Sequence, residues 1–517
     1  MSLAQKNIIE LFRKPGEKVE VRGAAPTQVV HAGNKAQEDE ERNITVFVEK
    51  PKKRQLDRWL DKVVQVSGSQ FVFLSILTGL LTWVLLGIRF GRNKTWQILI
   101  SDAQAIICYI FDWFLVRQQL NSYDEDMAVA TQMQSRSNSN LRMLSRLKNE
   151  PSQEQQAKVL SHLDQAFYGN DSIANQLPSE GGLGRFVTFV AFAIGHMVTI
   201  LLFWVGVFIW IGIGHLFDYS DTWQLYMNSA SSALMVFTFI FIANISERHS
   251  VYTKKCLDSL FQADSSLELR LRSLTHDVQS NIEVVIPAPK VGKVQRAIFY
   301  YTDFVGTLVG IAILLTVFAA WVAAGPALKF SSNWWLFIGT YAGLIGMFDG
   351  FVLRNMQSRL RSYTDTAMQV VDRRDTLLFE IIGLSFPVTG PEEKIPVTHQ
   401  VSQTLDRITS HQFAVVAGFL TVVGLIAAAS AMNWSLTGQL LCNVPPSIIE
   451  SFLMIVLVTG HNSIEEKKRR ELLILYERRL RLSSYVEMIE GLQNESTLGS
   501  KGKETVVDTT LTTTVSG

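Results

Sequence analysis

The stretch Phe217–Tyr252 reads FDYSDTWQLYMNSASSALMVFTFIFIANISERHSVY. It opens with an acidic and aromatic turn, and an apolar helical pattern follows that carries a short polar patch at 228–232. Beyond Asn244 the composition becomes charged, while the helical pattern continues. The stretch is therefore typical of a membrane span that runs on into water as one long helix.

Apolar residues in the rest of the chain gather into similar runs. The chain has 517 residues, of which 47% are hydrophobic and 18% charged, and its formal net charge is +1. A run of about 20 apolar residues crosses a hydrocarbon layer of about 30 Å. A soluble helical protein would need a polar face on most of its helices, so we predict an all-α polytopic membrane protein. Its eight predicted transmembrane helices are 71–88, 95–116, 190–214, 223–245, 303–325, 334–353, 411–432 and 436–459.

The predicted spans form four helical hairpins that follow one another as tandem parallel repeats. Each hairpin has a short connector and is followed by a long polar helix, which we expect in the cytosol. Thr95–Ile98 matches Thr222–Leu225, and Phe111–Arg117 matches Phe348–Arg354. Repeats with an even number of spans share one orientation, so an axis along the membrane normal can relate them. The predicted repeats occupy 56–189, 190–290, 291–398 and 399–493, and the first includes a long cytosolic insert.

The two ends of the chain are polar. Residues 1–55 are charge-mixed and predict a disordered cytosolic arm, and residues 494–517 predict a disordered tail. The first residues lack an apolar signal-peptide core, so we expect the first span to act as its own insertion signal. Cys108, Cys256 and Cys442 are too few and too scattered to predict a disulfide framework or a zinc finger.

Charge predicts the orientation. The chain has 48 Lys and Arg residues, and only Arg89, Arg92, Lys94 and Lys329 fall in the short connectors. The side that carries the long polar helices is therefore cytoplasmic by the positive-inside rule, and both termini lie there. The three basic residues of the first connector run against this rule.

The turn before the fourth span carries a family signature. Ser220 to Leu225 reads SDTWQL, and Asn228 follows one turn later. This pattern resembles the low-affinity iron permease family, whose short bacterial members hold it in a single hairpin. The resemblance implies a multi-pass plasma-membrane permease that takes up Fe²⁺ with low affinity, and Zn²⁺ and Cu²⁺ as well.

Four carboxylates lie in the second spans of the hairpins: Asp102, Asp112, Asp349 and Glu450. A carboxylate in lipid costs about 2.5–3.5 kcal/mol on the insertion scale, and no cationic side chain lies inside a predicted span. These groups should face a polar interior, a bound cation or one another, although each could also be merely interfacial.

Helical spacing predicts two layers for these groups. Asp102, Asn228 and Asn443 form a predicted outer polar layer, and Asp112, Asp349 and Glu450 a predicted inner acidic layer. If the repeats follow in order round the axis, Asp112 and Asp349 face each other diagonally.

Softer donors lie beside these groups. Met347 precedes Asp349 by two residues, Met454 follows Glu450 by one turn, Cys442 adjoins Asn443, and His196 falls in the third span. Oxygen donors suit hard divalent cations, whereas sulfur and imidazole extend the choice to Fe²⁺, Zn²⁺ and Cu²⁺. All ten residues are candidate metal ligands, while packing and interhelical hydrogen bonding are the alternative roles for the last four.

The sequence predicts a transporter and not an enzyme. It has neither a GxxxxGK[ST] nor an HExxH motif, and it completes no RExxE motif at Arg470. We expect no cofactor, no nucleic-acid partner, a lipid bilayer as surroundings, and divalent metal ions as substrate, driven by membrane potential or a proton gradient. A homo-oligomer stays open. The alternatives are a cation channel with an acidic pore and a membrane sensor or scaffold without transport.

Overall fold

The computed structural model describes residues 16, 18–30, 46–47, 55–148, 158–163, 182–384, 404–405 and 407–511, and helix dominates them. Most of the N-terminal arm, part of the first insert and the end of the tail lie outside the described residues. Within the described part, the main helices are α3 (Gln55–Ser67), α4 (Gln70–Phe90), α5 (Lys94–Leu147), α7 (Gly182–Ile194), α8 (Met197–Ile213), α9 (Asp221–Thr275), α10 (Lys293–Val305), α11 (Leu308–Ala324), α12 (Ser332–Ile382), α14 (Gln412–Ala431) and α15 (Leu436–Leu511).

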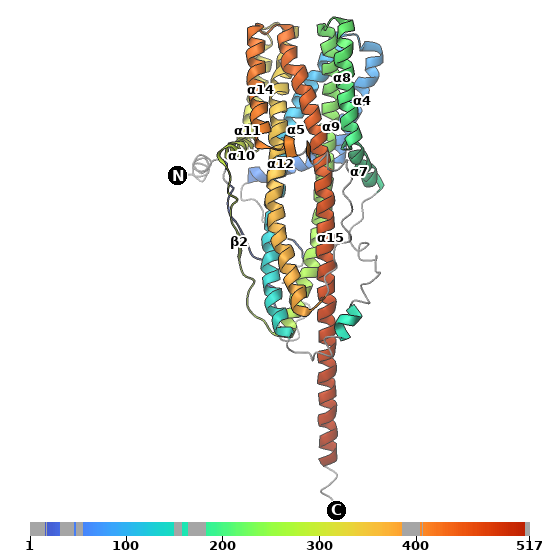
Figure 1. The fold of residues 1–517 in the computed structure, drawn as a ribbon, viewed down its shortest axis with the longest axis vertical. Coiled ribbons are helices and arrows are strands. Elements are labelled where there is room, and N and C mark those ends of the chain that lie inside the picture. The colour runs from blue at the N-terminus through green and yellow to red at the C-terminus, as the bar shows by residue number, and fades with distance from the viewer. Residues whose placement is uncertain are drawn as a thin grey trace, which may run out of the picture.

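The long helices α5, α9, α12 and α15 form a central bundle (Figure 1). Helix α5 packs against α9 and α12, and α15 packs against the same two helices. The order round the bundle is therefore α5, α9, α15, α12, so the repeats do not follow in order round the axis, which was the condition for a diagonal placement of Asp112 and Asp349. Helices of the first and fourth hairpins are diagonal, and α12, which carries Asp349, is a neighbour of α5, which carries Asp112.

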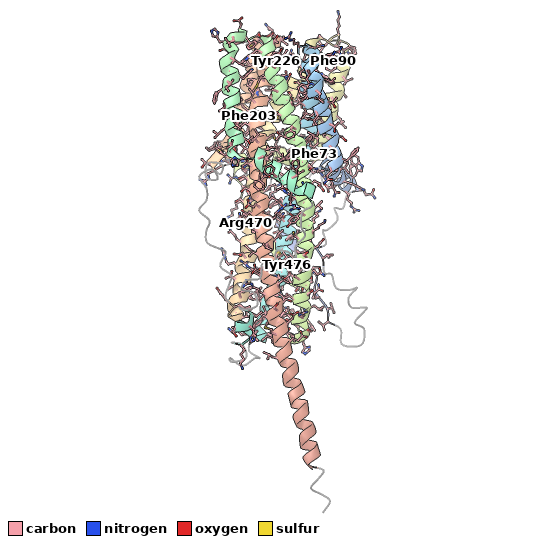
Figure 2. The ribbon with its side chains drawn as sticks, turned by 90° about the vertical axis from the view of Figure 1, so that its right-hand side faces the viewer. Phe73, Phe90, Phe203, Tyr226, Arg470 and Tyr476 are labelled. Atoms are coloured by element: carbon pink, nitrogen blue, oxygen red, sulfur yellow. The ribbon has the colours of Figure 1, made fainter. Side chains whose placement is uncertain are left out.

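The upper part of the molecule in Figure 1 is its apolar half, where α4, α8, α11 and α14 surround the long helices. Helix α4 buries none of its residues in the protein, and Phe71, Leu85 and Ile88 are exposed. Figure 2 shows Phe90 and Phe203 in this half, and Arg470 and Tyr476 in the lower, polar half. Among the described residues, seven helices are long and apolar enough to cross a membrane, or eight if the bent pair α10–α11 counts as one span.

Each outer helix begins at a capped break instead of continuing from the segment before it. The predicted spans 190–214 and 303–325 are each divided, because α7 ends before Gly195-His196 and α10 ends before Gly306-Thr307. Helices α10 and α11 meet at an angle of 67°. The side chains that cap the four outer helices by accepting a backbone N–H are Ser69, His196, Thr307 and His411. Such caps satisfy donors that a helix start leaves unpaired.

A pair of tryptophans closes the outer turn of three hairpins. The indole rings of Trp83 and Trp96, of Trp210 and Trp223, and of Trp321 and Trp334 stack at 4.2, 3.9 and 4.4 Å between centroids. In the pair Trp321–Trp334 each indole N–H donates to the backbone carbonyl of the other residue, at 3.0 and 2.8 Å. The fourth hairpin has Leu425 and Gly438 at these positions.

These turns set a common register for the long helices. Trp96, Trp223, Trp334 and Gly438 are equivalent, so equivalent positions in α5, α9, α12 and α15 differ by 127, 111 and 104 residues. The same offsets bring Ser137, Asp264, Asp375 and Arg479 to one level of the polar half. Arg479 donates to Ser137 Oγ at 3.2 Å and to Asp375 Oδ1 at 2.8 Å, and lies 2.7 Å from Asp264 Oδ1. The register therefore holds over about 40 residues of each helix.

A short strand pair lies along the polar half. Strand β1 (Val21–Gly23) pairs antiparallel with β2 (Val284–Ile286), with Arg22 opposite Val285. The part of the N-terminal arm that the structure describes here is thus ordered, because β1 packs against α5 and completes its hydrogen bonds with β2.

Candidate functional site

One level of the bundle axis, which we call the upper polar layer, is formed by four residues at equivalent positions of the long helices: Ser101, Asn228, Gly339 and Asn443. The amide nitrogen of Asn443 lies 3.5 Å from the hydroxyl of Ser101, and a Cβ atom at Gly339 would lie 3.0 Å from the same nitrogen. Asn228 is fully buried, and its amide oxygen and nitrogen have no hydrogen-bond partner in the described part of the chain. Asn228 and Asn443 therefore lie at equivalent positions of their helices.

Asp102 lies one residue beyond this layer, level with Ser229 and Thr340. Ser101 lies at the axis position that we predicted for Asp102. The prediction aligned the repeats at their acidic groups, and that alignment differs by one residue from the alignment at the tryptophan turns. Asp102 is 5% exposed, and its Oδ1 has no hydrogen-bond partner among the described residues.

Glu450 occupies the next level, which we call the Glu450 layer, with Cys108, Met235 and Gly346. The side chains of Glu450, Cys108 and Met235 are buried. The carboxylate lies against the glycine, since a Cβ atom at Gly346 would be 2.6 Å from Glu450 Oε2. Neither carboxylate oxygen has a hydrogen-bond partner within the described ranges. A thiol and a thioether thus share the level of an unpaired carboxylate, a combination that sequence reasoning missed because Cys108 and Met235 look like packing residues.

Asp112 lies one helical turn further in, level with Phe239, Gly350 and Met454 (the Asp112 layer). It is 1% exposed, and both its oxygens lack hydrogen-bond partners in the part of the molecule described. It interacts electrostatically with Glu450 and with Asp349. Met454, predicted as a ligand, occupies this level and also packs in the central hydrophobic cluster.

Asp349 is held away from this axis position. The hydroxyl of Tyr301 on α10 donates to Asp349 Oδ1 at 2.6 Å. Asp349 is equivalent to Phe111 and Thr238, one residue before the Asp112 layer. Sequence reasoning missed Tyr301, because it lies in a short amphipathic helix before the span.

The other predicted ligands lie off the axis. Cys442 packs with Leu344 and Ala429, and its thiol lies 3.3 Å from the carbonyl of Leu425. His196 is exposed and caps α8, accepting from the N–H of Val198 at 3.2 Å. Met347 is fully buried, one residue beyond the Glu450 layer.

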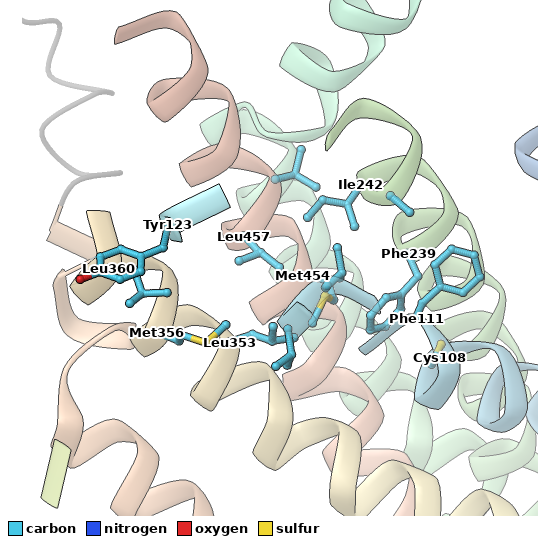
Figure 3. Close-up of a cluster of buried hydrophobic side chains, with 14 of the residues drawn as sticks. Cys108, Phe111, Tyr123, Phe239, Ile242, Leu353, Met356, Leu360, Met454 and Leu457 are labelled. Atoms are coloured by element: carbon cyan, nitrogen blue, oxygen red, sulfur yellow. The ribbon is translucent and has the colours of Figure 1, made fainter. Parts of the chain in front are cut away.

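A hydrophobic cluster, which we call the plug, separates the acidic groups from a cavity in the polar half. The plug is formed by Leu115, Phe239, Ile242, Leu353, Met454 and Leu457. Figure 3 shows the plug, in which Met454, Phe239 and Leu353 meet. Leu115, Ile242 and Leu457 belong both to the plug and to the lining of the cavity. The cavity has a volume of about 660 Å³ and lies between α3 and the four long helices.

Two histidines lie in the wall of this cavity, beyond the ends of the predicted spans. His249 Nδ1 lies 3.0 Å from His461 Nε2, and the rings are nearly parallel, 9° apart. Burial lowers the pKa of His249 to about 2 and that of His461 to about 4, so both rings are neutral at physiological pH. His249 follows Asn228 by 21 residues on the axis face of α9, a spacing that could have identified it.

The described residues contain no three His, Cys, Asp or Glu side chains already grouped as a metal site. Among the described residues, the axis offers buried oxygens of Asn228, Glu450 and Asp112 without hydrogen-bond partners, with sulfur at the levels of the two carboxylates. A buried carboxylate requires a proton or a cation, so this arrangement suits the passage of a cation.

The chain is similar to known iron transport proteins. The model of the family "Low affinity iron permease" matches residues 183–289 and 398–498, which cover the second and fourth hairpins. The low-affinity iron/zinc ion transport protein of Schizosaccharomyces pombe is 32% identical over 497 residues, covering 91% of this chain and 84% of the relative. The low-affinity Fe(2+) transport protein of Saccharomyces cerevisiae is 33% identical over 465 residues, covering 83% of each.

No solved structure matches the chain. The two relatives match at over 30% identity along most of their length, and they confirm the resemblance carried by the SDTWQL turn. The chain belongs to the low-affinity iron permease family, whose members are transporters and not enzymes.

Proposed function

We propose that this protein is a low-affinity permease for Fe²⁺ and Zn²⁺ that passes them along the axis of the central bundle. The observation that carries the proposal is the series of side-chain oxygens of Asn228, Glu450 and Asp112 that have no hydrogen-bond partner among the described residues and lie at axis positions of three levels. The relatives named for iron and zinc transport support the choice of ions.

The Glu450 and Asp112 layers are the proposed ion-binding region. Glu450 and Asp112 come from diagonal helices, so their carboxylates approach each other across the axis. Cys108 and Met235 accompany Glu450, and Met454 accompanies Asp112. Sulfur donors beside carboxylates favour borderline and soft ions such as Fe²⁺, Zn²⁺ and Cu²⁺ over Mg²⁺ and Ca²⁺. We therefore include copper among the proposed substrates.

In the proposed topology eight spans cross the plasma membrane as four hairpins. The outer helices α4, α8, α11 and α14 face lipid, the tryptophan turns face outward, and the polar half with both termini is cytoplasmic. The exposed apolar surface of α4 and the distribution of Lys and Arg support this arrangement. The amphipathic helices α3, α7 and α10 then lie at the inner membrane surface.

The ion enters at the upper polar layer and leaves through the cavity in the polar half. The plug between the acidic groups and the cavity must open once in each cycle, which favours a carrier over an open channel. An inside-negative potential contributes about 2.3 kcal/mol per charge per 100 mV, or about 4.6 kcal/mol for a divalent ion. This is enough to drive entry without ATP.

Uptake of ⁵⁵Fe²⁺ and ⁶⁵Zn²⁺ by vesicles that contain only the purified protein tests the proposal. We expect saturable uptake that increases with an imposed inside-negative potassium-diffusion potential. Glu450→Gln should lower it, whereas Asp218→Asn, at the outer turn, should not. Normal uptake by both Glu450→Gln and Asp112→Asn would place the ion path elsewhere, and single-channel currents would favour the channel alternative.

A further inference from the structure

We propose that His249, His461 and Glu465 form a second metal-binding site, which receives a transition-metal ion on the cytoplasmic side of the plug before release. This inference rests on the proposed transport function and adds an inner site of different chemistry. The three residues line the cavity below the plug. His461 and Glu465 lie one turn apart on α15, and His249 comes from the adjacent helix α9.

The place of the site on the axis follows from the common register. His461 is equivalent to Gln119, Ser246 and Gln357, and all four line the cavity. His461 follows Glu450 by 11 residues on α15. At about 100° and 1.5 Å per residue, the two side chains face nearly the same direction and lie about 16 Å apart along the helix. An ion that leaves the Asp112 layer, one helical turn beyond Glu450, through an open plug therefore meets the histidine pair next.

The three side chains lie close to the arrangement of a metal ligand set, although their distances are not those of a bound ion. The ring nitrogens of His249 and His461 are 3.0 Å apart, whereas two nitrogens at about 2.0–2.1 Å from a tetrahedral ion are about 3.3 Å apart. Glu465 Oε2 lies 3.9 Å from His249 Nδ1. Small side-chain rotations therefore suffice to direct three donors at one point, and two ligands one turn apart on a helix are a usual arrangement for such ions.

The proton count also permits binding. Two neutral imidazoles joined by a hydrogen bond place one N–H between them. A metal ion can take the place of that proton when the donor ring moves its proton to its other nitrogen, so no proton has to leave the protein. Glu465 Oε1 lies 3.4 Å from the guanidinium of Arg469, which leaves Oε2 on the side of His249. Two imidazoles and one carboxylate favour Zn²⁺ and Fe²⁺ over Mg²⁺.

If His249 and His461 bind no metal, their role is to join α9 to α15 through the hydrogen bond between their rings. Glutamine can retain a hydrogen bond between the helices but provides no imidazole. The double substitution His249→Gln/His461→Gln therefore distinguishes a ligand pair from a structural pair. His162→Asn is the matched control, because His162 is exposed on residues 158–163, away from the cavity lining.

The experiment uses the full chain in lipid nanodiscs, with a purification tag free of histidine. X-ray absorption at the zinc edge measures imidazole ligation, and calorimetry measures Zn²⁺ affinity. We expect imidazole ligation in the unsubstituted protein and in His162→Asn, and its loss in the double variant. Glu465→Gln leaves the histidine pair intact and should weaken Zn²⁺ binding at the inner site at least tenfold.

Unchanged zinc ligation in the double variant, or unchanged affinity in Glu465→Gln, would overturn the inner site. The same preparations are assayed for uptake in vesicles. Uptake by the unsubstituted protein without imidazole ligation would overturn the inner site and leave the proposed function standing. Absence of uptake by the unsubstituted protein would overturn the proposed function, and with it the release role of the site.

Discussion

The hydroxyl of Tyr301 donates a hydrogen bond to Asp349 Oδ1 at 2.6 Å, and this contact distinguishes Asp349 from Asp112 and Glu450. Asp112 and Glu450 have four carboxylate oxygens without partners in the described ranges, whereas Asp349 has a short hydrogen bond from α10. The three carboxylates, which look equal in the sequence, therefore have different surroundings and should differ in function.

Neutral substitutions of the three carboxylates should differ in their effect on Fe²⁺ uptake, because Asp112 and Glu450 lie at axis positions and Asp349 does not. We expect Asp112→Asn and Glu450→Gln each to lower Fe²⁺ uptake at least tenfold, equivalent to about 1.4 kcal/mol. Asp349→Asn should lower it less, because the amide can still accept from Tyr301. Initial uptake rates, corrected for surface expression, measure this. An Asp349→Asn defect as large as the other two would contradict the separation.

Gly346→Ala should displace the Glu450 carboxylate without removing its charge. A Cβ atom there would lie 2.6 Å from Glu450 Oε2, which is the far end of a flexible side chain and can move. We therefore expect reduced uptake and raised KM for Fe²⁺, with thermal stability little changed. Gly424→Ala on α14 is the control, since nothing lies within 4 Å of its Cβ position. Equal uptake by the two variants would show that the placement of Glu450 does not matter.

The tryptophan pairs should stabilise the outer turns. Trp334→Ala removes a stacked ring and the hydrogen bond from its indole N–H to the backbone carbonyl of Trp321. Truncation of a buried aromatic costs about 3–5 kcal/mol, so we expect a clear fall in the melting temperature of the detergent-solubilised protein. Trp59→Ala on α3 is the control, because Trp59 is 59% exposed. If both lower the melting temperature alike, the pair has no special role.

Arg479 should be essential to the polar half of the bundle. Its replacement by methionine leaves Asp375 as a buried carboxylate without its cation, at a cost of about 3–5 kcal/mol, whereas Asp264 keeps its ion pair with Arg136. Adding Asp375→Asn to Arg479→Met should restore much of the stability, because Asp375 then carries no unpaired charge. Thermal unfolding of the single and double variants measures this. A double variant less stable than the single one would contradict the explanation.

The sequence predicts the helical class and the family, because apolar run length and the SDTWQL turn are local features. It does not reveal the order of the long helices round the bundle or the level of Asp102, since the neighbours of a helix and a register shift of one residue depend on packing between distant segments. The breaks at His196 and Thr307 were hidden because apolar residues lie directly on both sides of each break. His249 and Tyr301 escaped for a similar reason: only the folded bundle brings them to Glu465 and Asp349.

The circular order of the long helices has a consequence for how the ring can assemble. Hairpins one and two are neighbours, and so are hairpins three and four, so a chain divided in the segment between β2 and α10 would yield two contiguous arcs of the ring. Both strands of the sheet would stay with the first arc. The ring closes only where α12 meets α5 and where α15 meets α9, so two separately synthesised halves have two defined seams along which to complement each other.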